Sequence, residues 1–220
     1  FDIKSKNVLY VHLTLVPYIK TSGELKTKPT QHSVQKLREI GVQPDILLCR
    51  TEKKLDTNLK NKIALFCNVD VDSVITAMDV KSIYEVPLSL EEEGLSDIIL
   101  SKLEISVKEP DLEAWKKVQQ ILNKPKAGEV DIAVVGKYID LQDSYKSLTE
   151  ALIHGGIGND VRVKIHWIDA GTLENQDDPT DLKRYDGILV PGGFGERGIE
   201  GKIRSIQYAR ENKVPFFGIC

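Results

Sequence analysis

The chain has 220 residues, of which 41% are hydrophobic and 29% charged, which is typical of a globular protein with one large or two small domains. Its formal net charge of −3 argues against a general nucleic-acid surface, because such surfaces usually carry an excess of basic residues. No apolar run approaches the roughly 20 residues that a membrane-spanning helix needs, and the first residues lack the apolar core of a signal peptide.

The three cysteines, Cys49, Cys67 and Cys220, show no C-x-x-C spacing. This pattern indicates neither a disulfide framework nor a zinc site, and it fits a reducing, cytoplasmic environment. The chain begins without Met and stops at Cys220, directly after an apolar run. We therefore interpret it as an interior piece of a longer cytoplasmic protein.

Strand and helix patterns alternate through the first half of the chain. Apolar, β-branched runs predict buried strands, and apolar residues at helical spacing predict amphipathic helices. The predicted strands cover residues 7–16, 45–49 and 73–77. The predicted helices cover residues 34–40, 55–63 and 95–103, with a loop at 23–29. This alternation is typical of a parallel sheet covered by helices.

Between about residues 104 and 128, lysines, glutamates and prolines surround one predicted helix, which is typical of a linker. Strands are predicted again at residues 130–136, 161–168, 187–190 and 214–219, and helices at 144–153 and 199–212. We predict an α/β fold with two parallel-sheet, three-layer domains. Their expected bounds are residues 1–105 and 129–220, with a linker over 106–128.

A glycine turn and a cysteine follow two strands of the second predicted domain. Pro191-Gly192-Gly193-Phe194-Gly195 follows one strand, and Cys220 ends the last one. In open α/β sheets ligands bind at the carboxyl ends of the strands, so we expect both features at one site. Backbone N–H groups of the turn could stabilise the oxyanion that forms when the Cys220 thiolate attacks an amide. The alternative is an ordinary tight turn beside a core cysteine.

The loop at 23–29 and the helix after it concentrate positive charge and hydroxyl groups. Lys26 and Lys28 flank Thr27, while Thr30 and Gln31 open the helix. Two ammonium groups near a helix N-terminus favour an anion site, and the hydroxyl and amide groups can bind a sugar or base. We interpret the segment as a triphosphate site, although it is not a P-loop motif. A solvated, lysine-rich loop is the alternative.

These segments resemble the CTP synthase family over essentially the whole chain. The residues that carry the resemblance are 12–18, 23–34, 43–50, 62–67, 136–138, 143–147 and 191–201. The Lys-Thr-Lys-Pro-Thr-Gln run at 26–31 is specific to that family. The Pro-Gly-Gly-Phe-Gly and Gly-Ile-Cys runs are shared more widely among class I glutamine amidotransferases.

The resemblance implies a P-loop-type amidoligase domain followed by a flavodoxin-like glutaminase domain. It implies that ATP phosphorylates the 4-oxygen of UTP, and that ammonia from glutamine, channelled between the domains, displaces the phosphate to give CTP. It also implies Mg²⁺ with ATP, feedback inhibition by CTP, activation by GTP, and a homotetramer that sometimes forms filaments. Neither nucleic acid nor a membrane is an expected partner.

The resemblance assigns four groups of site residues. The UTP and CTP group is Lys26, Thr27, Lys28, Thr30, Gln31 and Lys62. The ATP group, near the adenine, is Arg50, Asp79 and Val80. The glutamine group is Gly193 at the oxyanion and Cys220 as the nucleophile. The lid that responds to GTP is Phe194, Arg197, Gly198 and Glu200.

The chain lacks the phosphate-binding loop of the family, its magnesium-binding acids, and the His and Glu of the thiol triad. These residues are expected before Phe1 and after Cys220, so we expect no turnover from this piece alone. Two alternatives are a stand-alone glutaminase subunit and a non-enzymatic UTP- or CTP-binding regulatory or filament protein. The 26–31 run argues against the first, and Cys220 argues against the second.

Overall fold

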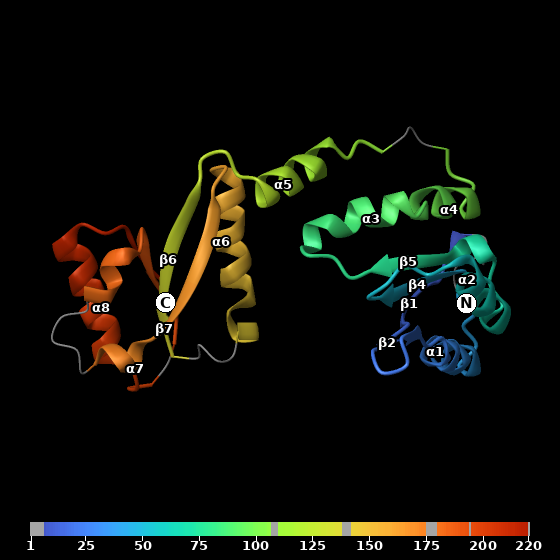
Figure 1. Cartoon of the computed structure of the whole chain (residues 1–220), viewed down its shortest axis with the longest axis horizontal. Coiled ribbons are helices and arrows are strands. Elements are labelled where there is room, and N and C mark those ends of the chain that lie inside the picture. The colour runs from blue at the N-terminus through green and yellow to red at the C-terminus, as the bar shows by residue number, and fades with distance from the viewer. Residues whose placement is uncertain (1–6, 107–109, 138–141, 175–179, 194, 220) are drawn as a thin grey trace. The chain divides into compact units, whose positions relative to one another are not determined.

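The computed structural model describes residues 7–106, 110–137, 142–174, 180–193 and 195–219. The chain divides into two compact units, Phe1–Gln119 and Gln120–Cys220. Each unit has a parallel sheet with helices on both faces (Figure 1). The predicted fold class, α/β with parallel sheets in three layers, is therefore confirmed.

The first unit is built on a three-stranded parallel sheet in the order β1-β4-β5. Its strands are β1 (Val11–Leu15), β4 (Ile46–Thr51) and β5 (Val74–Met78). A small antiparallel hairpin, β2 (Tyr18–Ile19) with β3 (Glu24–Leu25), follows β1. The helical elements are α1 (Lys28–Glu39), α2 (Thr57–Cys67), η2 (Val71–Ser73), η3 (Ile83–Glu85), α3 (Val86–Glu92) and α4 (Leu95–Lys102).

Alternate residues of β4 face opposite sides of this sheet, as the pleat of a strand requires. Leu47 and Cys49 are buried in a core with Val34 of α1 and Ile63 of α2. Leu48, on the other face, lines a cavity beneath α3. The sheet therefore lies between α1 and α2 on one side and α3 on the other (Figure 1).

The start of α1 differs from the prediction. A helix was expected from residue 34 after a loop at 23–29, but the loop contains β3 and the helix begins at Lys28. Pro29 lies in the first turn, where its missing N–H has no intrahelical partner to lose. Pro29, which the prediction included in the loop at 23–29, is thus part of the first turn of α1.

The second unit has a four-stranded parallel sheet in the order β7-β6-β8-β9. Its strands are β6 (Glu129–Gly136), β7 (Arg162–Asp169), β8 (Gly187–Val190) and β9 (Phe216–Gly218). The helical elements are η4 (Gln142–Tyr145), α6 (Lys146–Gly158), α7 (Ala170–Leu173), η5 (Thr180–Arg184) and α8 (Ile199–Asn212). Helix α6 covers one face, and α7 with α8 covers the other (Figure 1).

The main core of the second unit lies between the sheet and α8, where Val135, Ile188 and Ala209 are buried together. Helix α6 approaches the opposite face closely. A Cβ at Gly156 would lie 2.8 Å from the carbonyl oxygen of Val161, so this position of α6 requires glycine.

Helix α5 (Glu113–Asn123) lies within the expected linker, and the division between the two units falls inside it. It has no buried residue. The expected domain bounds stay predictions.

The sequence patterns missed two short helices, α3 and α7, and placed the start of the first strand four residues before Val11. Within the described residues, no helix combines the length and apolar character that crossing a membrane requires.

Candidate functional site

An apolar cavity of about 490 Å³ lies between the sheet of the first unit and α3. Its residues come from all three strands, from the segment that follows β5, and from α3. They include Leu13, Leu48, Ala77, Met78, Ile83, Val86 and Leu90. A cavity of this volume and character is within the usual range for small-molecule sites.

Arg50, Asp79 and Val80, the residues assigned to ATP, all line this cavity. Arg50 lies near the carboxyl end of β4, and Asp79 directly follows β5. The Nε of Arg50 donates a hydrogen bond to Oδ1 of Asp79 at 2.8 Å. Both side chains are well exposed, so this ion pair adds little stability and stays open to a ligand. The structure brings the three residues together, and their role in ATP binding stays a prediction.

Two hydroxyl groups of the 26–31 segment are bonded inside the protein. Thr30 is fully buried, and its Oγ1 donates to the carbonyl oxygen of Leu15 at 3.0 Å. Thr27 is only 4% exposed, and its Oγ1 accepts from Nε2 of Gln31 at 3.1 Å. The Thr30 bond holds the start of α1 against the end of β1, and the bond between Gln31 and Thr27 lies within the segment itself. The structure thus shows Thr27, Thr30 and Gln31 positioning the segment, while direct contact with a nucleotide stays a prediction.

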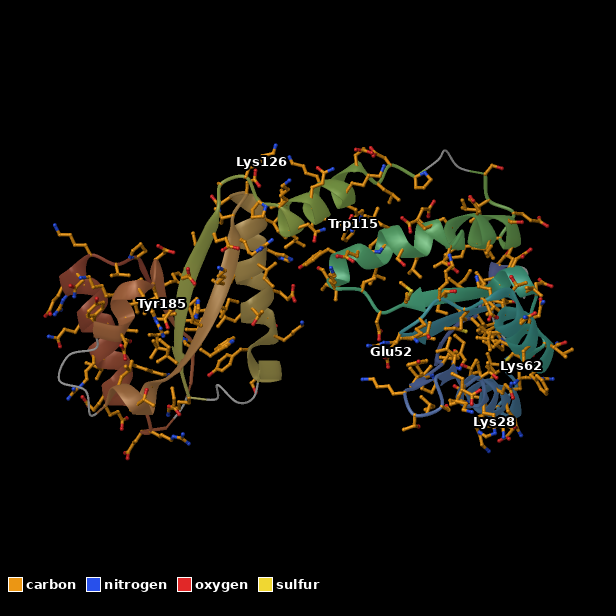
Figure 2. All side chains as sticks on the ribbon, in the orientation of Figure 1. Lys28, Glu52, Lys62, Trp115, Lys126 and Tyr185 are labelled. Carbon is orange, nitrogen blue, oxygen red and sulfur yellow. The ribbon has the colours of Figure 1, made fainter. Side chains whose placement is uncertain are left out.

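The three lysines of this region are exposed, and two of them act on one carboxylate, Glu24. Lys26 forms an ion pair with Glu24, and that hydrogen bond is the main reason why the pKa of Glu24 is lowered. The charge of Lys62, on α2, also lowers the pKa of Glu24. Lys62 is therefore close enough to act on the same loop as Lys26. Lys28 is the first residue of α1 and is exposed (Figure 2).

In the second unit, the glycine turn lies beside the end of β9. The backbone N–H of Ile219 donates to the carbonyl of Val190 at 2.9 Å. A Cβ at Gly192 would lie 3.6 Å from the carbonyl oxygen of Ile219. The residue before Cys220 is thus next to the diglycine turn, as expected. Cys220 and Phe194 themselves lie outside the described residues.

The other two cysteines are poor candidates for a nucleophile. Cys49 and Cys67 are both buried in the core of the first unit. Burial raises the pKa of each thiol to about 11, so both stay protonated at neutral pH. Cys220 is therefore the cysteine for which a role in covalent chemistry stays open.

Two lysines to which the sequence analysis assigned no role converge on the glycine turn. Nζ of Lys137 donates to the carbonyl of Gly195 at 2.5 Å, and Nζ of Lys202 donates to the carbonyl of Pro191 at 3.4 Å. Burial lowers the pKa of Lys202, and the charge of Lys137 lowers it further. Lys137 directly follows the strand that ends at Gly136, and this position at a carboxyl end was the signal that could have drawn attention to it.

The described residues of the expected lid lie just before α8 and in its first turn. Arg197 forms an ion pair with Asp169, the last residue of β7, at 3.4 Å. Gly198 caps α8 in the left-handed region, with φ of 78°. Glu200 lies in the first turn of α8, where the helix dipole stabilises a negative charge. Their response to GTP stays a prediction.

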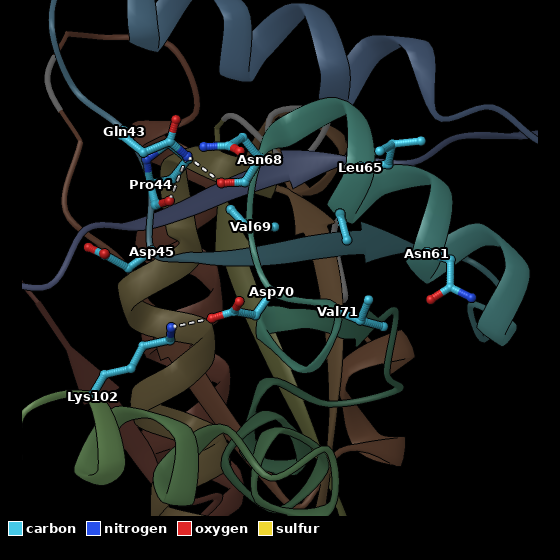
Figure 3. Close-up of a pocket in the computed structure, with 11 residues that line it drawn as sticks. Gln43, Pro44, Asp45, Asn61, Leu65, Asn68, Val69, Asp70, Val71 and Lys102 are labelled. Carbon is cyan, nitrogen blue, oxygen red and sulfur yellow. Dashed lines mark hydrogen bonds and ion pairs between the residues drawn. The ribbon is translucent and has the colours of Figure 1, made fainter.

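A second cavity, of about 590 Å³, lies at the amino-terminal ends of β4 and β5 (Figure 3). Nε2 of Gln43 donates to the carbonyl oxygens of Cys67 and Asn68 at 3.2 and 3.0 Å. Lys102 of α4 forms an ion pair with Asp70 at 3.0 Å. None of the predicted site residues lines this cavity. Across the described residues, no group of three or more His, Cys, Asp or Glu side chains is arranged to hold a metal ion.

Comparisons with known proteins match both units. A family model for the CTP synthase N-terminus matches residues 1–105, and one for class-I glutamine amidotransferase matches residues 140–220. The chain is 61% identical to a CTP synthase of Geobacter metallireducens and 59% identical to one of Geobacter sulfurreducens, each over 219 residues. A CTP synthase of Maridesulfovibrio salexigens is 57% identical over the same length.

Each of these matches covers the whole chain, but the chain spans only about two fifths of each relative, 40% or 41%. Among solved structures, the glutaminase domain of a Trypanosoma brucei CTPS with bound acivicin is 42% identical. That similarity covers 40% of this chain and 35% of the solved chain, with a TM-score of 0.38.

Proposed function

The chain belongs to the CTP synthase family, and we propose that its full-length protein converts UTP to CTP with ATP and with nitrogen from glutamine. The observation that carries the proposal is the sequence identity of 57–61% over the whole chain to relatives named CTP synthase. Because the chain spans about two fifths of those relatives, the reaction is proposed for the full-length protein and not for this piece alone.

In the first unit, we propose that ATP places its adenine in the apolar cavity beside Arg50, Asp79 and Val80. A flat, mostly apolar base suits such a cavity, and the exposed ion pair at its edge offers polar contacts. Mg²⁺ bound with ATP would neutralise phosphate charge. Its protein ligands are proposed to lie outside this chain.

We propose that the triphosphate of UTP binds at Lys26, Lys28 and Lys62. All three are exposed, and two of them act on the same carboxylate, Glu24. Ammonium groups bind phosphate through charge-assisted hydrogen bonds. CTP carries the same triphosphate, so it would compete for this site and inhibit the enzyme.

In the second unit, we propose that the Cys220 thiolate attacks the side-chain amide of glutamine. The new C–S bond forms a tetrahedral oxyanion, which the backbone N–H of Gly193 would bind. The C–N bond then breaks, ammonia leaves, and water hydrolyses the thioester to glutamate and the free thiol. The ammonia would attack C4 of the phosphorylated UTP and displace phosphate to give CTP. Arg197, Gly198 and Glu200 would form part of a lid through which bound GTP activates glutamine hydrolysis. The full-length protein would be a tetramer.

Replacing the proposed nucleophile tests the separation of the two reactions. In the full-length protein, Cys220→Ala should abolish CTP formation from glutamine and leave CTP formation from added ammonium chloride unchanged. Both activities would be measured from the absorbance change that accompanies conversion of UTP to CTP. Loss of both activities in a folded variant would contradict the assignment of separate sites to the two units.

A further inference from the structure

The side chain of Lys137 packs along the loop that contains the glycine turn. Lys137 is only 8% exposed, and it extends from the end of β6 to the carbonyl of Gly195. A Cβ at Gly193 would lie 4.0 Å from its Cδ, and one at Gly198 would lie 3.7 Å from its Cγ. The aliphatic part of Lys137 therefore packs along the loop while its ammonium group binds the backbone.

A second lysine reaches the same turn from α8. Nζ of Lys202 donates to the carbonyl of Pro191 and would lie 3.3 Å from a Cβ at Gly193. A side chain at 193 would crowd this ammonium group, which would have to shift by a few tenths of an ångström, so glycine at this position leaves Lys202 room. The two lysines bind the two ends of the turn, Pro191 and Gly195.

These contacts have a consequence for the N–H groups of the turn. In a trans peptide the carbonyl and the following N–H point in opposite directions. A lysine that holds the carbonyl of Pro191 therefore directs the N–H of Gly192 away from itself. The two contacts therefore restrict the backbone on either side of the diglycine, where glycine by itself is free to adopt many conformations.

We propose that Lys137 and Lys202 are positioning residues for amide hydrolysis, holding the carbonyls of Pro191 and Gly195 so that the diglycine turn presents its N–H groups to the oxyanion. The inference rests on the proposed glutaminase reaction and adds the residues that preorganise its oxyanion site. Preorganised donors stabilise a transition state without a reorganisation cost, so loosening the turn should slow acylation rather than weaken glutamine binding.

The test uses Lys202→Met in the full-length protein, because this side chain is less buried than Lys137. The kcat for glutamine hydrolysis should fall by about 10- to 100-fold, as expected for a displaced donor, with KM changed by less than about threefold. Lys202→Arg, which keeps a cationic donor, should recover most of the activity. CTP formation from ammonia should be unchanged.

Alkylation of Cys220 by iodoacetamide separates positioning from a general structural effect. Alkylation requires the thiolate but forms no oxyanion, so its rate in Lys202→Met should match that of the unaltered protein. Lys183→Met provides a control in the same unit, since Lys183 is an exposed lysine of η5. Lys137→Met, checked for folding by thermal melting, should show the same split between hydrolysis and alkylation.

An unchanged kcat in Lys202→Met would overturn the inference, and so would an equal loss of hydrolysis and alkylation. If the full-length protein itself hydrolyses no glutamine, the proposed function fails as well. If it hydrolyses glutamine through Cys220 and Lys202→Met has no effect, the inference fails alone.

Discussion

Lys28 and Thr30 show how neighbouring residues of one motif take different tasks. Thr30 is fully buried and bonded to the backbone of β1, whereas Lys28 is exposed at the first residue of α1. A buried hydroxyl with a partner fixes the local backbone, because breaking that bond leaves a polar group unsatisfied. An exposed ammonium group near a helix N-terminus is free to meet a phosphate. The motif therefore combines a structural anchor with a cationic surface.

Lys28→Ala should weaken the binding of UTP and CTP together, each by about tenfold, because both nucleotides carry the triphosphate that the ammonium group would bind. Equilibrium titration of each nucleotide into the full-length protein measures the effect. Lys36→Ala, which removes an exposed lysine from the same helix, is the matched control. Unchanged affinity for both nucleotides in Lys28→Ala would contradict the assignment of Lys28 to a triphosphate site.

Glu93 connects three elements of the first unit. It directly follows α3, accepts from the backbone N–H of Thr76 in β5 at 3.1 Å, and pairs with Lys60 of α2 at 2.8 Å. Its side chain is only 12% exposed. Burial by itself would raise the pKa of Glu93, but the hydrogen bonds from Lys60 and Thr76 outweigh burial and lower the pKa to about 2.

Glu93→Gln should therefore destabilise the chain by about 1–3 kcal/mol at neutral pH, because Lys60 loses its charged partner. The folded-state pKa of about 2 is below the ordinary value of 4.5, so the contribution of Glu93 is present above pH 4.5 and is lost as the pH falls toward 2. Urea unfolding from about pH 3 to pH 7 should show the difference between variant and parent shrinking as the pH falls. Glu92→Gln, at the exposed neighbouring residue, should change stability by less than about 0.5 kcal/mol. A difference that is constant with pH would contradict this role.

At the scale of the whole molecule, the two units are separate compact bodies whose division falls inside α5. A helix without buried residues has little tertiary packing to stabilise it, and short isolated helices are marginal in water. Such a segment opens more readily than α2 or α8, which contribute buried residues to the two units.

Limited trypsin digestion of the 220-residue chain should therefore cut first at the lysines of the α5 segment, Lys116, Lys117 and Lys124. Mass spectrometry of the early products identifies the cleavage sites and should show two fragments that resist further digestion. First cleavage within α2 or α8 would show that the units themselves open more easily than α5.

Local sequence patterns were enough to predict the parts of this protein that depend on neighbouring residues. Apolar runs predicted seven strand segments that the structure confirms, and they predicted that the glycine turn follows the end of a strand, as it does after β8. Such patterns suffice because the alternation of a strand and the repeat of a helix are properties of neighbouring residues. The family resemblance also came from short runs, and the comparisons confirm it.

Which distant residues meet depends on how the chain folds in three dimensions. The fold buried Thr27 and Thr30, brought Lys62 of α2 near Glu24, and placed Arg50, Asp79 and Val80 around one cavity. It also directed Lys137 and Lys202, from two separate elements, to the two ends of one turn. The physical reason is that these contacts depend on how strands order within a sheet and on where helices pack, and no local pattern specifies either.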